Sequence, residues 1–85
     1  MEKENLIITV SGRAASGKSR LTYLLKNFLR EQGLEVEFEG NIDHPNENDF
    51  NRDMGKHFDE VINFMKETCK ITLKQVQLPR NRIKN

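Results

Sequence analysis

The 85-residue sequence has a single cysteine and no long hydrophobic run. Because Cys69 has no second thiol, an internal disulfide and a zinc site built on several cysteines are both excluded. This cysteine usage is typical of a reduced setting, so a cytoplasmic localisation is expected. The first apolar run, Leu6–Val10, is much shorter than the hydrophobic part of a signal peptide or a membrane-spanning helix, and neither is expected.

The sequence also lacks an excess of charge of either sign. Its 14 Lys and Arg residues and 13 Asp and Glu residues give a formal net charge of +1. No overall field draws the chain to nucleic acid or to an anionic membrane, and neither is an expected partner. Residues 79–85 are nevertheless basic, with Arg80, Arg82 and Lys84. We interpret them as a solvated tail, and an arm that contacts nucleic-acid phosphates is the alternative.

Apolar residues are few, at 35% of the chain, but they are clustered. Clustering is typical of a folded chain rather than a disordered one, so residues 1–85 are expected to form a single small domain of marginal stability. The run Leu6–Val10 predicts a strand covered on both faces, whereas residues 34–38 alternate with glutamates and predict a strand with one wet face. Residues 71–76 predict a third strand, which Pro79 ends.

Two apolar stripes at helical spacing lie between these predicted strands. The first predicts a helix from Lys18 that ends at Gly33, with Leu34 folding back on Leu29 in a Schellman-type cap. The second predicts a helix capped around Asn48 or Asp49, with the stripe Met54, Phe58, Val61, Ile62 and Met65. The order β-α-β-α-β predicts an α/β fold with a three-stranded parallel sheet, in which Leu6–Val10 is central.

A phosphate-binding motif joins the first predicted strand to the first predicted helix. The motif G-x-x-x-x-G-K-[ST] is matched in full by Gly12, Arg13, Ala14, Ala15, Ser16, Gly17, Lys18 and Ser19. Its glycines let backbone N–H groups approach phosphates, and the helix N-terminus attracts an anion. In such a loop Lys18 reaches the β- and γ-phosphates, and the Ser19 hydroxyl ligates Mg²⁺. The sequence therefore predicts binding of ATP or GTP together with Mg²⁺.

Residues 6–19 resemble the opening of P-loop nucleoside and nucleotide kinases, and the stretch Ala15–Ser19 is especially similar to uridine kinase and cytidylate kinase. The resemblance implies a minimal P-loop NTPase-like fold, nucleotide binding at Gly12, Gly17, Lys18 and Ser19, and transfer of the γ-phosphate of ATP to a small acceptor. The close likeness covers about the first third of the chain. The compact whole also resembles short P-loop proteins encoded by bacteriophages.

The rest of the sequence lacks groups that these kinases use in catalysis. Their Walker B strand ends on an acidic residue that holds Mg²⁺, but residues 70–77 contain no carboxylate. An arginine-bearing lid is also missing. Asp43 follows the second predicted strand, on the expected ligand side, so we predict it as a catalytic residue beside Lys18 and a metal ligand beside Ser19. A loop turn that binds nothing is the alternative for Asp43.

Two roles are possible for some side chains near the motif. Arg13 and Arg20 flank the loop and either contact phosphate or are solvated. Four phenylalanines are expected in the core rather than in a base-stacking platform, namely Phe28, Phe38, Phe58 and Phe64.

The sequence favours a nucleotide-binding module with little or no intrinsic turnover. One alternative is a minimal kinase or NTPase that is completed by oligomerisation or by a partner. The other is a phage interaction protein that inhibits a host enzyme, with that host protein as its partner. An exposed edge strand at residues 71–76 would also predict a homodimer.

Overall fold

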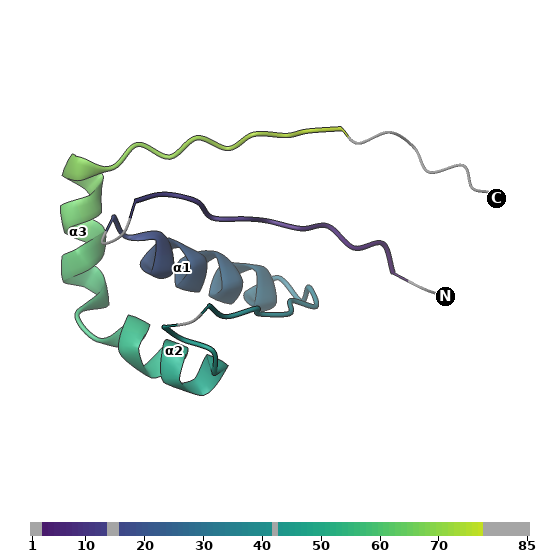
Figure 1. Ribbon diagram of the computed structural model, residues 1–85, viewed down its shortest axis with the longest axis horizontal. Coiled ribbons are helices and arrows are strands. Elements are labelled where there is room, and N and C mark those ends of the chain that lie inside the picture. Colours follow the sequence, from purple (N-terminus) through teal and green to yellow (C-terminus); the bar gives the residue numbers. More distant parts are fainter. Residues whose placement is uncertain (1–2, 14–15, 42, 78–85) are drawn as a thin grey trace.

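The computed structural model describes residues 3–13, 16–41 and 43–77, and the regular elements of these ranges are three helices (Figure 1). They are α1 (Lys18–Glu31), α2 (Glu47–Gly55) and α3 (Phe58–Thr68). No residue in the described ranges belongs to a strand. The predicted α/β fold with a three-stranded parallel sheet is therefore wrong, and the described chain is all-α.

The segments predicted as strands lie outside the helices and form no sheet. Leu6 is 90% exposed in the first of them and Leu73 is 84% exposed in the third. Figure 1 shows the N-terminal segment running toward α1 and the segment after α3 running in the opposite direction, so these two are not parallel. A β-prone sequence favours an extended backbone, but a strand also needs a neighbour at hydrogen-bonding distance. Within the described ranges no backbone hydrogen bond joins these segments to one another.

Helix α1 begins and ends where the sequence predicts. It starts at Lys18, and Gly33 ends it with a left-handed φ of 87°. The Gly33 N–H donates to the Arg30 carbonyl at 2.9 Å, and the Leu34 N–H donates to the Leu29 carbonyl at 3.2 Å. These two bonds form a Schellman cap, so the predicted helix end is confirmed.

The second predicted helix is in fact two helices. The Asn46 side chain caps α2 by accepting the N–H groups of Asn48 at 2.7 Å and Asp49 at 3.2 Å. Helix α2 ends at Gly55, and His57 takes a left-handed φ of 53° before α3 begins. A single helix capped around Asn48 or Asp49 is therefore wrong in both its start and its continuity.

A small core forms where α2 and α3 meet α1. The buried apolar side chains of the described residues are Phe50, Met54 and Met65. The Tyr23 ring of α1 packs edge-on against Phe50 and Phe58, with centroids 6.2 Å and 5.6 Å apart. These contacts attach one face of α1 to both of the other helices.

The four phenylalanines predicted for the core divide into two pairs. Phe38 lies 4.5 Å from Phe50 between ring centroids, and Phe58 is half-buried against Tyr23. Phe28 and Phe64 are 55% and 64% exposed, so the prediction is wrong for them. Without a covering sheet, the outer faces of α1 and α3 stay open.

A polar contact also joins α1 to α2. The Lys26 ammonium is buried and lies 3.3 Å from the Glu47 carboxylate, to which the Arg30 guanidinium also donates. The hydrogen bond from Arg30, and then Lys26, hold the pKa of Glu47 below its ordinary value, although burial opposes this shift. Arg30 further donates to the Val36 carbonyl at 2.9 Å, which fixes the chain that follows α1.

Candidate functional site

The predicted phosphate-binding loop leads directly into the N-terminus of α1. Gly17 is the N-cap residue and has a left-handed φ of 105°. No side chain among the described residues caps this end, and the first turn contains no acidic residue. The first backbone bond of the helix runs from the Leu21 N–H to the Gly17 carbonyl at 2.9 Å. In an α-helix the N–H groups of the first turn have no acceptors within the helix. The N-terminus of α1 therefore attracts anions.

The loop before this helix is folded back on itself. The Ser16 N–H donates to the Arg13 carbonyl at 3.3 Å. A Cβ added to Gly12 would lie 3.0 Å from the Ser16 hydroxyl oxygen and 3.3 Å from Cγ of Lys18. The fold of the loop therefore brings together Gly12, Ser16, Gly17 and Lys18. Two further predicted loop residues, Ala14 and Ala15, lie outside the described residues.

The C-terminal end of α3 packs against the loop. A Cβ on Gly17 would come within 2.6 Å of the Met65 sulfur. The Cys69 thiol donates to the Ser16 carbonyl at 3.2 Å. Neither residue was predicted at this site. The apolar stripe that contains Met65 indicates a buried helix face but not what that face packs against.

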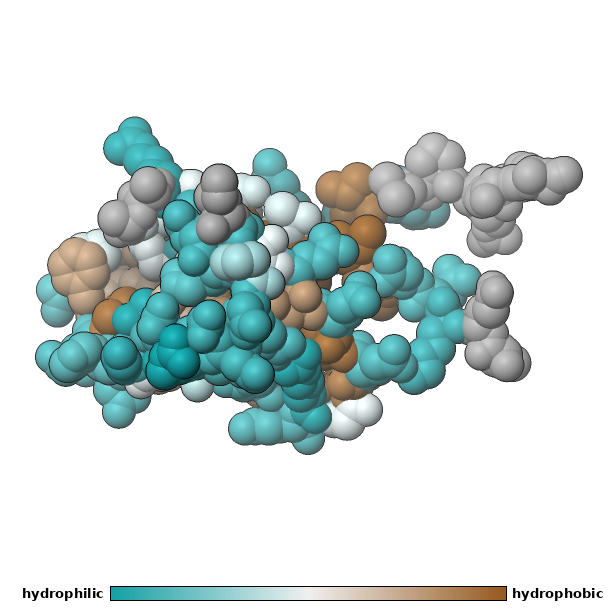
Figure 2. Space-filling view, turned by 60° about the horizontal axis from the view of Figure 1, so that its bottom comes forward, coloured by the Kyte–Doolittle hydropathy of each residue, from teal (hydrophilic) through white to brown (hydrophobic). Residues whose placement is uncertain are grey.

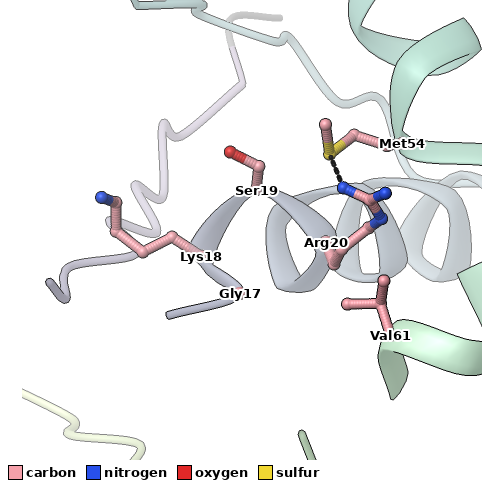
Figure 3. A pocket seen from close by; sticks show the side chains of 6 residues that line it. All are labelled: Gly17, Lys18, Ser19, Arg20, Met54 and Val61. Carbon is pink, nitrogen blue, oxygen red and sulfur yellow. Dashed lines mark hydrogen bonds between the residues drawn. The ribbon is translucent and has the colours of Figure 1, made fainter. Parts of the chain in front are cut away.

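A hollow of about 250 Å³ lies beside the first turn of α1 (Figure 3). Its lining combines polar residues of the loop and α1 with apolar residues of α2 and α3: Gly17, Lys18, Ser19, Arg20, Met54 and Val61. The side chains of Lys18 and Arg20 point to different sides of this turn, and Arg20 points toward Met54. The lysine and the arginine therefore do not converge on one point.

Arg20 contacts α2 rather than the loop. Its guanidinium donates to the Met54 sulfur at 3.2 Å and to the Lys56 carbonyl at 3.0 Å. Its Nε atom is buried and has no hydrogen-bond partner among the described residues. Arg13, by contrast, is exposed beside the loop. Of the two flanking arginines, Arg13 is thus the one whose side chain is open to an incoming anion.

Asp43 lies in a separate turn. The Asn41 side-chain oxygen accepts the N–H groups of Asp43 and His44, each at 3.0 Å, in an Asx-type turn. The Asp43 side chain is exposed, and it does not line the hollow beside α1. Its roles as catalytic residue and metal ligand stay predictions. His44 pairs instead with Asp53, at 3.2 Å between Nε2 and Oδ2.

The arrangement offers little coordination from the protein to a metal ion. Within the described ranges, no group of three or more His, Cys, Asp and Glu side chains is placed to hold a metal. Ser19 is half-buried at the helix start and supplies one hydroxyl oxygen. That fits a Mg²⁺ held mainly by phosphates and water, since such ions take only one or two ligands from the protein.

Comparison with known proteins gives no match to any family model, curated protein or solved structure. As for membranes, none of the helices in the described part of the chain has the length and apolarity needed to span a bilayer.

Proposed function

We propose that the loop of residues 12–19 and the N-terminus of α1 bind the phosphates of a nucleoside triphosphate, ATP or GTP, together with Mg²⁺. The observation that carries the proposal is the position of the motif. Its Gly-Lys-Ser end falls at the N-cap and first two residues of a helix, and no side chain of the described chain caps that helix. Phosphate binding at such a helix end depends on local backbone geometry and charge, so an all-α fold does not oppose it.

Each loop residue has a role in this proposal. The N–H groups at the start of α1 donate to phosphate oxygens, and Lys18, whose aliphatic stem lies beside Gly12, adds a positive charge. The Ser19 hydroxyl would hold Mg²⁺, which would neutralise charge on the phosphates. The exposed guanidinium of Arg13 is available for an outer phosphate oxygen.

We propose that the protein binds the nucleoside triphosphate but transfers or releases its phosphate little or not at all. Phosphoryl transfer needs a carboxylate to hold the metal and orient the nucleophile, and a second positive group to neutralise the moving phosphate. Residues 70–77 contain no carboxylate, and Arg20 is bonded to α2. Asp43, the acidic residue predicted for this role, lies in an exposed turn that does not line the hollow.

Calorimetric titration with ATP, GTP, pyrophosphate and adenosine, each with and without Mg²⁺, tests the proposal. Because the contacts are to phosphates, both triphosphates and pyrophosphate are expected to bind, and adenosine is not. Mg²⁺ is expected to strengthen binding of the triphosphates. Equal affinity for adenosine and ATP would contradict phosphate recognition. Absence of binding by all four ligands would contradict the proposed function.

A further inference from the structure

The described chain buries few apolar side chains and exposes many. Phe50, Met54 and Met65 form the buried apolar set. Large exposed apolar side chains occur on all three segments outside the helices, at Leu6, Ile7, Ile8, Leu34, Ile71, Leu73 and Val76. Figure 2 shows patches of apolar surface, in brown, among the hydrophilic residues of the face in view. A contiguous exposed apolar surface is typical of an interaction site.

Two of these segments carry matching patterns of opposite charge. We name residues 34–39 the acidic segment and residues 70–75 the basic segment. The acidic segment alternates three apolar residues with Glu35, Glu37 and Glu39. The basic segment alternates Ile71, Leu73 and Gln75 with Lys70, Thr72 and Lys74. Because side chains two residues apart share a face of an extended chain, each segment has one charged row and one mainly apolar row.

The spacing of the charges also matches. Glu35 and Glu39 are four residues apart, and so are Lys70 and Lys74, which is about 13 Å along an extended chain in both cases. The burial of the acidic segment follows the expected alternation, with Val36 half-buried and the glutamates exposed. The two charged rows can therefore face each other, and the exposed Leu34 can meet the apolar row of the basic segment. Phe38 packs against Phe50 of its own chain and stays there.

Within one chain the two segments do not meet. Among the described residues, no ion pair involves Lys70 or Lys74, and both side chains are exposed. Glu35 binds Lys3 of the N-terminal segment at 2.6 Å. In the view of Figure 1 the N-terminal segment and α1 separate the chain after α1 from the chain after α3. Glu35 therefore has a partner in its own chain, whereas the other charged side chains of the two rows form no ion pair among the described residues.

We propose that the occupant of these surfaces is a second copy of this chain. In a two-fold dimer, the acidic segment of each copy lies against the basic segment of the other. Each copy carries both rows, so the same contact forms twice, as two-fold symmetry requires. The dimer covers Leu34, Ile71 and Leu73, which are 57%, 50% and 84% exposed in one chain. This interface is independent of nucleotide binding.

A charge-swap experiment tests the dimer in the absence of nucleotide. One variant carries Lys70→Glu and Lys74→Glu, and the other carries Glu35→Lys and Glu39→Lys. The wild type is expected to have the mass of a dimer by light scattering at low salt. Each variant alone is expected to lose at least about tenfold in dimer affinity, because like charges then face each other. An equimolar mixture is expected to restore the dimer, since each variant presents the rows that the other requires.

The controls separate loss of the interface from loss of the fold. Lys66→Glu reverses an exposed lysine on α3, outside both segments, and is expected to leave the dimer intact. Leu73→Asp replaces a side chain that folding of one chain does not bury, so the helical circular dichroism should persist while dimer affinity falls at least about tenfold.

Three results would overturn the proposal. The first is a monomeric mass of the wild type at every concentration. The second is dimerisation of each charge variant as tight as that of the wild type. The third is a helical, monomeric mixture of the two variants. If the monomer of the first result also protects the backbone amides of residues 71–76 from hydrogen exchange, the basic segment is covered by its own chain.

Discussion

At the scale of single residues, Gly17 meets two separate constraints at the start of α1. Its φ of 105° disfavours any residue with a side chain, and Met65 occupies the space that a Cβ would need. Gly33 meets only the first constraint, since its φ is 87° and nothing lies within 4 Å of an added Cβ. Gly33 can therefore serve as the control for Gly17, because both have a positive φ and only Gly17 is packed against Met65.

Gly17→Ala is expected to destabilise the protein more than Gly33→Ala. Gly33→Ala should lower the free energy of unfolding by about 1–2 kcal/mol through backbone strain alone. Gly17→Ala should add a further loss of about 1 kcal/mol, because the flexible end of the Met65 side chain must shift to make room for the Cβ. Urea unfolding monitored by circular dichroism measures both values. Equal losses would show that Met65 does not pack against the loop as described.

The contact between Lys26 and Glu47 gives the stability a dependence on pH. The pKa of Glu47 is lower in the folded chain than its ordinary value, chiefly through the hydrogen bond from Arg30 and then through Lys26. A carboxylate with a depressed pKa stabilises the fold above its unfolded pKa, and this contribution disappears as the pH falls through the folded pKa. Stability is therefore expected to decline in acid below the ordinary pKa of a glutamate.

Glu47→Gln is expected to lower the free energy of unfolding at pH 7 by about 1–3 kcal/mol, because the buried Lys26 loses its carboxylate partner. The difference from the wild type should shrink as the pH falls toward 3. The control is Glu35→Gln, whose pair with Lys3 is exposed and screened by solvent, so its effect should be small. Urea unfolding at several pH values measures this, and a difference that stays constant with pH would contradict the role of Glu47.

At the scale of elements, the cap of α2 is the clearest local determinant of a helix start. The Asn46 side chain accepts two backbone N–H groups that would otherwise lack partners. Asn46→Ala is expected to cost about 1 kcal/mol of stability. Asn63→Ala, at an exposed position within α3, should be neutral or slightly stabilising, because alanine is the better helix former. Thermal unfolding of the two variants checks this, and equal melting temperatures would contradict the cap.

The helices differ in how far their sequences reveal them. Both ends of α1 follow from local signals, the motif before Lys18 and the glycine at position 33. The break between α2 and α3 does not, because the apolar stripe keeps helical spacing across it. His57 makes the break with a left-handed φ, which is uncommon for residues other than glycine. Gly55, the last residue of α2, is the local signal of the break, but a single glycine is tolerated within a helical pattern and does not outweigh the periodicity.

At the scale of the whole molecule, the sheet is where the sequence misleads. Alternation in residues 34–38 and the apolar run at 6–10 are local properties, whereas a sheet needs pairing between segments far apart in sequence. In the described chain that pairing is absent, and the segments stay exposed. The loop motif is a different case, since its residues are adjacent in sequence. Gly12, Ser16 and Lys18 come together without any sheet.

The whole chain is expected to turn over ATP at a trace rate. Arg20 is hydrogen-bonded to Met54 and Lys56 and the Arg13 side chain is exposed, so no arginine beside the described loop is held in place as an arginine finger. The lack of such a finger alone costs about three to five orders of magnitude in turnover. Residues 70–77 add no carboxylate, so any residual activity should depend on Asp43. Phosphate release from the purified wild type and from Asp43→Asn measures this. Turnover near one per second that is lost in Lys18→Ala would mean that other residues complete a catalytic site.

The central claim is that phosphates bind at the loop of residues 12–19, and one calorimetric comparison tests it directly. The wild type, Lys18→Ala and Lys3→Ala are titrated with Mg-ATP after circular dichroism has verified their helical content. Lys3 lies outside the loop and pairs with Glu35, so its variant should bind as the wild type does. Lys18→Ala removes a charge-assisted contact and should weaken binding by about tenfold to a hundredfold. Unchanged affinity in a folded Lys18→Ala protein would contradict the claim.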